Sequence, residues 1–290
     1  MLPVLLDLKF IKIYTFGVFL VLAFFWSSFI LWRTVRLTTY KEEDIFDGLF
    51  FMLGGALFGG RIVYVLSHFD KFGVDVLKFI LINGYPGLSL YGALGGALLT
   101  LFLFFGIKKI KFPDVIDYFI PAFFLATAIG KLGSFLSGVE IGAKTHFFLA
   151  IHYTNMDGLR HLTSFYESLF FFLGAFLSYQ LLFEIRRDKY QKGFQLVFFI
   201  WYFSVVYFVF DPLKAKMSFL YGMSLNYVVS LILLLTFSIY LIYYFRSLLQ
   251  SKTIGIINLL FRYGTRSFRS GKTTGKKITG REEGPSETNS

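Results

Sequence analysis

The sequence contains no cysteine, and only 16% of its residues are charged. Without cysteine there is no disulfide, no thiol nucleophile and no cysteine-ligated metal, so chemistry on a thiol must use a thiol of the substrate. A soluble domain is nearer a quarter charged. Histidine is scarce too, and His146, His152 and His161 are spaced irregularly, unlike metal ligands on one helix face. We expect no metal and no cofactor.

Apolar residues make up 56% of the chain, which includes 40 Phe, and this is more apolar surface than a globular core of this length buries. Seven segments are long enough to cross about 30 Å of hydrocarbon as helices. Helices are expected because no backbone group facing lipid can stay unpaired. The sequence therefore predicts an all-α polytopic membrane protein, which excludes a soluble fold. The predicted spans are Ile13–Trp32, Ile45–Leu66, Tyr85–Ile107, Asp117–Val139, Ser164–Phe183, Gly193–Phe210 and Ser218–Phe245.

Basic residues alternate along the loops and predict the orientation of the chain. The loops after the first, third and fifth spans and the segment after the seventh are dense in Lys and Arg, whereas the intervening loops hold fewer. The positive-inside rule then places the N-terminus outside and the C-terminus in the cytoplasm. The first apolar run is long enough to span, and we expect no cleavable signal peptide.

Two regions are predicted along the chain. Residues 1–250 form a seven-helix membrane domain with long outer-side loops at 67–86 and 140–163, and Val74–Asn83 is typical of an interfacial or re-entrant helix. Residues 251–290 are a basic tail of disordered composition. The net charge of +11 would suggest nucleic acid in a soluble protein. A basic segment after a span instead favours anionic lipid headgroups, so we expect no nucleic-acid partner.

Of the charged residues within or beside the predicted spans, four are of interest because they lie toward the outer side. Charge inside a span costs at least ~2.5–3.5 kcal/mol and needs a partner or a wet cavity. Arg61 and Asp211 lie close enough to span ends to reach headgroups on their own, and Glu167 can cap its helix. Lys131 lies deeper. Together the four could line one cavity.

Small residues recur four positions apart in three of the spans. Such pairs mostly allow helices to approach closely, and the alternative is a wall that a lipid headgroup or peptide backbone can approach. The sets are Gly55/Gly59, Gly92/Gly96 and Gly130/Ser134/Gly138.

Four motifs in order, GGRIVYVL, GLSLYGALGG, GKLGSFLSGVEIG and RHLTSFYESL, resemble those of the prolipoprotein diacylglyceryl transferases over roughly Ile13 to Phe245. The chain differs from that pattern at several places. Tyr91 stands where the family has histidine, Lys131 where it has arginine, and Ser134 where it has asparagine. Glu140 lies one place later than the family acid. In the fourth motif His161, Tyr166 and Glu167 remain, and in the sixth span Tyr202 remains, whereas the following family arginine aligns with Val206.

The resemblance implies transfer of a diacylglyceryl group from phosphatidylglycerol to the lipobox cysteine thiol of a prolipoprotein, in the bacterial plasma (inner) membrane. The expected partners are phosphatidylglycerol, the prolipoprotein signal peptide and membrane lipids. Cations must bind the leaving phosphate and a base must take the thiol proton. We assign phospholipid binding to Arg61, Lys131, Ser134, Gly138 and Tyr202. Thiol activation is assigned to the set Tyr91, Glu140, His161 and Glu167, among which the base stays open.

Two other functions remain possible from the sequence. A non-catalytic relative that binds phospholipid or lipoprotein precursors is consistent with the substitutions at Tyr91 and Val206. A small transporter or channel would need a polar path across the whole membrane, whereas the polar residues here collect on one side.

Overall fold

The computed structural model describes residues 2–8, 12–73, 75–81, 84–153, 156–215 and 224–246. The chain divides into two compact units, Met1–Phe237 and Ser238–Ser290. The site and the pockets discussed below belong to the first unit. The predicted tail, residues 251–290, lies outside the described residues.

All seven predicted spans are helices long and apolar enough to cross a membrane. Helix α5 begins at Leu90 rather than Tyr85, because Pro86 precedes it and the Ser89 side chain caps its first turn by accepting from the Gly92 N–H. The predicted start of the last span at Ser218 lies outside the described residues. The spans are α1 Thr15–Val35, α2 Glu42–Ser67, α5 Leu90–Ile107, α6 Phe112–Ser137, α7 Thr163–Arg186, α8 Phe194–Phe210 and α9 Leu225–Tyr244.

Short elements join the spans. The short helix predicted within Val74–Asn83 is found as α4, Val76–Ile80, capped by the Asp75 carboxylate, although Val74, Ile82 and Asn83 lie outside the described residues. Whether it is interfacial or re-entrant stays a prediction. Four strands were not predicted, because each is too short to show an alternating pattern. The remaining elements are the antiparallel pair β1 Val4–Asp7 and β2 Lys12–Tyr14, helix α3 Phe69–Phe72, the antiparallel pair β3 Ile151–His152 and β4 Leu159–Arg160, and a 3-10 turn at Asp211–Leu213.

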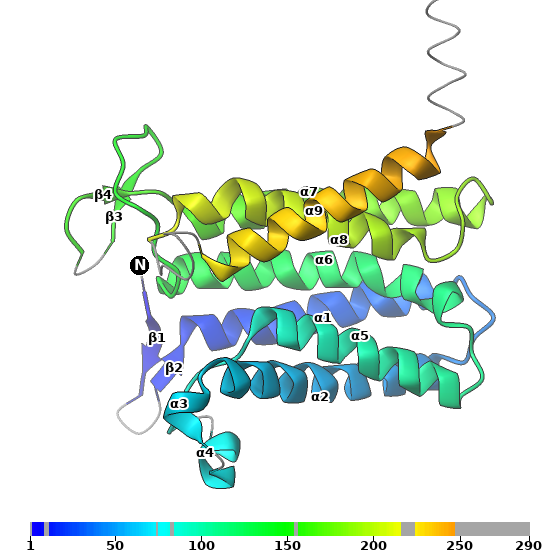
Figure 1. Ribbon diagram of the computed structural model, residues 1–290, viewed down its shortest axis with the longest axis horizontal. Coiled ribbons are helices and arrows are strands. Elements are labelled where there is room, and N and C mark those ends of the chain that lie inside the picture. Colours follow the sequence, from blue (N-terminus) through cyan, green and yellow to red (C-terminus); the bar gives the residue numbers. More distant parts are fainter. Residues whose placement is uncertain are drawn as a thin grey trace, which may run out of the picture. The chain divides into compact units, whose positions relative to one another are not determined.

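Helix α6 is the central helix of the bundle. It packs against α1 and α7 and also contacts α8, whereas α2 packs mainly against α5 (Figure 1). More than half of the α6 span is buried, a larger share than in any other described span. Its core side chains include Phe119 and Phe124, which pack with Phe171 of α7 and Phe203 of α8. The helix that carries Lys131 is therefore the one most removed from lipid.

Glycines set the contact between α2 and α5. A Cβ on Gly59 would lie 2.6 Å from the carbonyl oxygen of Gly92, and a Cβ on Gly92 would lie 2.6 Å from the carbonyl oxygen of Gly59. Only residues without a side chain allow this approach. The packing interpretation is therefore confirmed for Gly55/Gly59 and Gly92/Gly96, whereas nothing lies within 4 Å of the Cβ position of Gly130. Gly138 has another role, because it ends α6 in the left-handed conformation at φ 72°.

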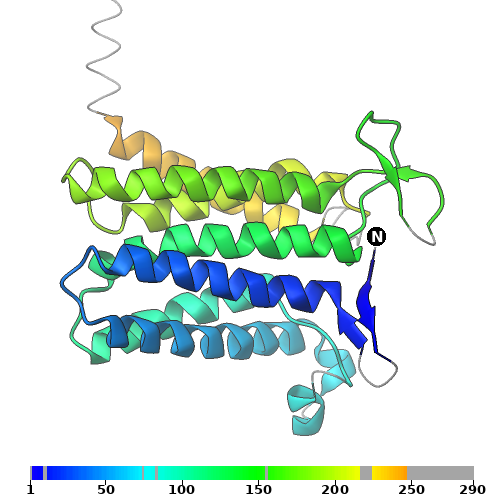
Figure 2. The same cartoon turned by 180° about the vertical axis from the view of Figure 1, so that it is seen from behind.

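The two ends of the bundle differ in character. At one end lie the four strands and the starts of α1 and α7, which we call the strand end (Figures 1 and 2). At the other lie the α1–α2, α5–α6 and α7–α8 loops, which carry the dense Lys and Arg residues and which we call the basic end. Which end faces the cytoplasm stays a prediction.

Candidate functional site

Lys131 lies at the centre of a buried ion cluster at the strand end. Its Nζ is 2.7 and 2.8 Å from the two carboxylate oxygens of Glu140 and 2.8 Å from Oε2 of Glu167. Glu167 is completely buried and Lys131 is 8% exposed. Two helices and a loop supply these residues: α6, α7 and the segment after Gly138. The sequence analysis expected a partner for each charge inside a span, and Lys131 and Glu167 are partners of each other.

Lys214 is a second cation in the cluster, and the sequence analysis did not assign it to the site. Its Nζ is 2.7 Å from Oε1 of Glu167, 3.6 Å from Asp211 and 3.8 Å from Glu140. An isolated β-bridge between Gly142 and Lys214 ties the segment after α8 to the loop after α6. The Asp211-x-x-Lys214 spacing directly after a span is the sequence signal that could have indicated this cation.

The two ammonium groups lie against the same aromatic ring and are surrounded by more carboxylates than there are lysines. The buried Tyr207 ring lies 5.2 Å from the Lys131 Nζ and 4.7 Å from the Lys214 Nζ, within the range of cation–π attraction. Two lysines face three carboxylates, so the cluster has one negative charge more than it has positive charges. An anionic ligand can therefore bind both lysines only if a carboxylate moves away.

Glu140 is the most accessible of these carboxylates. Its side chain is 32% exposed, compared with none of the Glu167 side chain. The Ser164 hydroxyl donates to its Oε2 at 2.9 Å. Although burial raises its pKa, Lys131, Lys214 and the hydrogen bonds lower it by more, to about 2. While paired, Glu140 is thus a permanently ionised group and a weak base.

Unpaired polar atoms lie beside the cluster at the start of α7. The Nδ1 of His161, the hydroxyl of Thr163 and the hydroxyl of Tyr166 are buried and have no hydrogen-bond partner among the described residues. The His161 ring is 6.5 Å from the Tyr166 ring, and Tyr166 is followed directly by Glu167. Buried polar atoms are costly to leave unpaired, so this group suits a ligand or water with its own hydrogen-bonding groups.

Arg61 is not part of the ion cluster. Its guanidinium donates to four carbonyl oxygens, two in α4 and two in the segment between α4 and α5, at 2.6–2.9 Å, and only 2% of the residue is exposed. Among the described residues Arg61 and Lys131 have no partner in common. Arg61 has five N–H groups, so nearly all its capacity holds this segment. Phosphate binding by Arg61 would require these carbonyl bonds to be exchanged. The four acceptors are Lys78, Phe79, Tyr85 and Gly87.

The other predicted residues divide between the cluster and the bundle interior. Ser134 is buried one turn after Lys131, and Gly138 ends the same helix. Tyr91 donates to the carbonyl of Asn226 at 3.1 Å and is close enough to Asp211 for a coulombic interaction. The Tyr202 hydroxyl instead donates to the Phe170 carbonyl at 2.7 Å, within the α7–α8 contact.

An apolar cavity of about 220 Å³ lies between α1, α2 and α6. Helices α1 and α2 are consecutive yet hardly touch, because each packs on a different partner. The cavity ends at Ala126, which precedes Lys131 by five residues, about 7.5 Å along the helix axis. Its shape and chemistry suit a hydrocarbon chain. It is lined by Leu20, Ala23, Phe24, Ser27, Leu31, Leu49, Met52, Leu53, Phe119, Ala122, Phe123 and Ala126.

Seven apolar helices around a buried lysine–carboxylate cluster define a polytopic membrane protein with an ionic site at one end of its bundle. The family model of prolipoprotein diacylglyceryl transferase matches residues 3–244. The chain therefore belongs to that family, as its motifs predicted.

Curated relatives carry the name phosphatidylglycerol–prolipoprotein diacylglyceryl transferase. The chain is 28% identical to the protein of Finegoldia magna over 244 residues, which cover 83% of this chain and 95% of the relative. It is 30% identical to the protein of Listeria monocytogenes serovar 1/2a over 211 residues, or 69% of this chain and 74% of the relative. It is 27% identical to that of Clostridium tetani over 206 residues, or 69% and 80%.

Proposed function

We propose that this protein transfers the diacylglyceryl group of phosphatidylglycerol to the lipobox cysteine of prolipoproteins, at the ion cluster of Lys131 and Lys214. The cysteine sulfur forms a bond to the terminal glyceryl carbon of the lipid while the bond from that carbon to the phosphate oxygen breaks. The products are a thioether-linked lipid and glycerol phosphate, which leaves with the electron pair. Family membership and the names of the relatives support this reaction.

The pair of ammonium groups, one buried and one largely buried, is the observation on which the site assignment depends. Negative charge grows on the phosphate as the carbon–oxygen bond breaks, and preorganised cations in a water-poor site stabilise such charge strongly. Lys131 and Lys214 both lie against Tyr207 and both contact Glu167, so their ammonium groups are held close together. Lys binds phosphate as a point charge, and two lysines can therefore replace one bidentate arginine.

In this proposal Glu140 occupies the position of the phosphate until the lipid arrives. It is the accessible carboxylate, it lies in a loop, and both its oxygens contact Lys131. Exchange of one anion for another leaves the charge of the cluster unchanged, whereas addition of phosphate beside three carboxylates would be unfavourable. Glu167 stays buried and keeps the two lysines in place.

For the thiol proton, His161 is the better acceptor in the described arrangement. Its buried Nδ1 is unpaired, whereas Glu140 is held ionised by the lysines. Tyr166 and Thr163 offer further hydroxyls for the peptide backbone around the cysteine. The thiolate would form beside two cations, which lower the cost of its negative charge.

The apolar cavity between α1, α2 and α6 supplies a place for an acyl chain near the ion cluster. Because the lipid and the lipobox helix both reside in the bilayer, holding them together accounts for a large part of the expected rate. We further propose that the strand end is the extracytoplasmic end in the bacterial inner membrane. The dense basic loops at the opposite end support this orientation.

Transfer from labelled phosphatidylglycerol to a lipobox peptide tests the proposal. We expect Lys131→Gln and Lys214→Gln each to lower turnover by at least ~100-fold, the usual cost of losing one group that stabilises transition-state charge. Lys189→Gln, an exposed cation at the basic end, is the matched control and should keep normal turnover. Full activity in either cluster variant would remove this site assignment. Lipid binding by the wild type without thioether product would instead favour the non-catalytic binder.

A further inference from the structure

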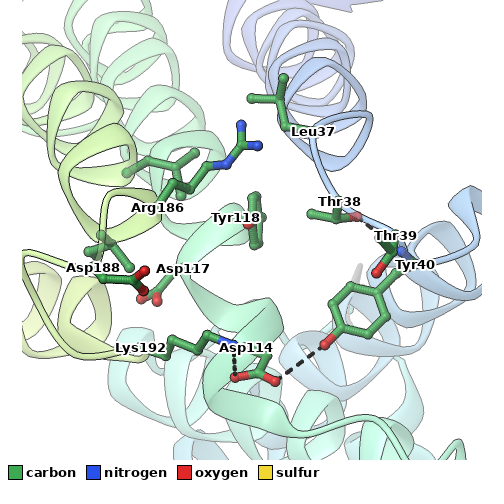
Figure 3. Close-up of a pocket in the computed structure, with 12 residues that line it drawn as sticks. Leu37, Thr38, Thr39, Tyr40, Asp114, Asp117, Tyr118, Arg186, Asp188 and Lys192 are labelled. Atoms are coloured by element: carbon green, nitrogen blue, oxygen red, sulfur yellow. Dashed lines mark hydrogen bonds and ion pairs between the residues drawn. The ribbon is translucent and has the colours of Figure 1, made fainter.

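A second polar pocket lies at the basic end, away from the ion cluster. Its volume is about 280 Å³, and it is formed by the α1–α2 loop, the first turns of α6 and the end of α7 with the loop that follows (Figure 3). Apolar side chains such as Leu37 and Ile185 line it together with the ring of Tyr118. The transfer reaction proposed above makes no use of this pocket.

Most charged groups of the pocket are satisfied within the protein. Asp114 forms an ion pair with Lys192 at 3.2 Å and accepts a hydrogen bond from the Tyr40 hydroxyl at 3.4 Å (Figure 3). The buried Asp117 accepts from the backbone N–H groups of residues 193 and 195, at 2.7 and 3.0 Å. These two carboxylates hold the start of α8 and the loop before it. They are therefore part of the pocket's frame.

One cation and one anion remain. The guanidinium of Arg186 and the carboxylate of Asp188 both line the pocket, and neither has a hydrogen-bond or ion-pair partner among the described residues. They do not pair with each other. Figure 3 shows the Arg186 guanidinium on the side of Leu37 and Thr38 and the Asp188 carboxylate on the side of Asp117. The pocket thus presents separated positive and negative groups over an apolar base.

This pocket lies at the depth of lipid headgroups, because Arg186 is the last residue of a spanning helix and Thr38 and Thr39 connect two others. We propose that it binds the zwitterionic phosphoethanolamine headgroup of a membrane phospholipid. Arg186 would bind the phosphate through parallel N–H donors, and Asp188 would accept from the ammonium group. The hydroxyls of Thr39 and Tyr118 provide further donors for phosphate oxygens.

Charge complementarity favours ethanolamine over other headgroups. Phosphatidylglycerol offers the same phosphate but no cation for Asp188. Phosphatidylcholine has a cation but no N–H to donate, so it cannot hydrogen-bond a carboxylate. Basic pockets between spanning helices bind anionic phospholipid headgroups, and here the carboxylate of Asp188 adds an acceptor that an ammonium group can satisfy. The proposal places a lipid at the end opposite the transfer cluster and does not depend on transfer activity.

Native mass spectrometry of the full-length protein in detergent, titrated with each phospholipid, measures retained lipid directly. We expect the wild type to retain one phosphatidylethanolamine more tightly than phosphatidylglycerol or phosphatidylcholine. Arg186→Gln should weaken retention of phosphatidylethanolamine about tenfold, the cost of one charge-assisted contact. Arg187→Gln, whose wild-type side chain instead contacts Glu184 at 3.4 Å, is the matched control and should bind normally.

Asp188→Asn tests the headgroup itself. The substitution keeps a residue type that tolerates the backbone φ of 58° at this position, so the loop should fold. We expect the preference for phosphatidylethanolamine over phosphatidylcholine to disappear. Unchanged retention in both pocket variants, or a wild-type preference for phosphatidylglycerol, would overturn the proposal. Equal binding of glycerophosphoethanolamine without acyl chains would show a pocket for a soluble ligand and would also overturn it.

Discussion

At the scale of single residues, the sequence predicted four members of the ion cluster and missed two. Lys131, Glu167 and Asp211 were singled out because charge is costly inside a span, and Glu140 was singled out through the family resemblance. The structure brings these residues together. Lys214 lies outside a span, where a cation needs no partner, so only its spacing from Asp211 could have indicated it. Tyr207 is one of 18 tyrosines and had no distinguishing pattern.

Arg61 shows a different limit of sequence reasoning. Its position near a span end suggested a free cation, yet its partners are backbone carbonyls of a segment that follows much later in the chain. Every residue type has a carbonyl, so such partners cannot be recognised from side-chain chemistry. A buried guanidinium with four backbone acceptors is best understood as the group that holds the segment before α5.

The pKa of Glu140 gives a prediction for stability. Its folded value of about 2 lies below the ordinary 4.5, so its contribution is fully present above pH 4.5 and is lost as the pH falls toward 2. We expect the melting temperature of the wild type to exceed that of Glu140→Gln near neutral pH. The difference in melting temperature should shrink between pH 4.5 and 2. Thermal unfolding in detergent at a series of pH values measures it. A difference independent of pH across this window would contradict the assignment.

At the scale of elements, run length predicted all seven spans, while local chemistry set their ends. The Ser89 cap and Pro86 moved the start of α5, and Gly138 fixed the end of α6. The strands could not be predicted from an alternating sequence pattern because each holds only two to four residues. Packing partners were not predictable either, since the small-residue pairs indicate close approach without naming the neighbouring helix.

The α2–α5 contact gives a prediction at this scale. Gly59→Leu would place a side chain against the backbone of α5, where the Gly92 oxygen lies 2.6 Å from the Cβ position. Overpacking of this kind costs roughly 1–3 kcal/mol or more when backbone must move. Gly54→Leu is the matched control on the same helix, because nothing lies within 4 Å of its Cβ position. Thermal unfolding should show a large loss of stability for Gly59→Leu only. Equal stability of the two variants would contradict the close contact between α2 and α5.

At the scale of the whole molecule, the distribution of charge separates two polar sites. The ion cluster lies at the strand end, and the pocket of Arg186 and Asp188 lies at the basic end. The orientation of these ends in the membrane was derived from loop charge alone. The absence of cysteine makes that orientation easy to measure, since any introduced thiol is unique.

We predict that Ser67→Cys is labelled from outside the cell by a membrane-impermeant maleimide, whereas Thr39→Cys is labelled only after the membrane is opened. Ser67 ends α2 at the strand end, and Thr39 lies between α1 and α2 at the basic end. The wild type, which has no thiol, is the background control. The reverse labelling pattern would invert the topology and place the ion cluster in the cytoplasm.

The pairing of Lys131 with Glu167 has a consequence for how the protein is made. Each residue alone would carry an uncompensated charge into hydrocarbon, but they belong to consecutive spans, α6 and α7. The insertion machinery would therefore release these two helices into the bilayer together, as a hairpin in which the two charges are paired, rather than singly. Lys214, which follows α8, joins last and closes the cluster, so a nascent chain halted before that point would be inserted but unable to mature.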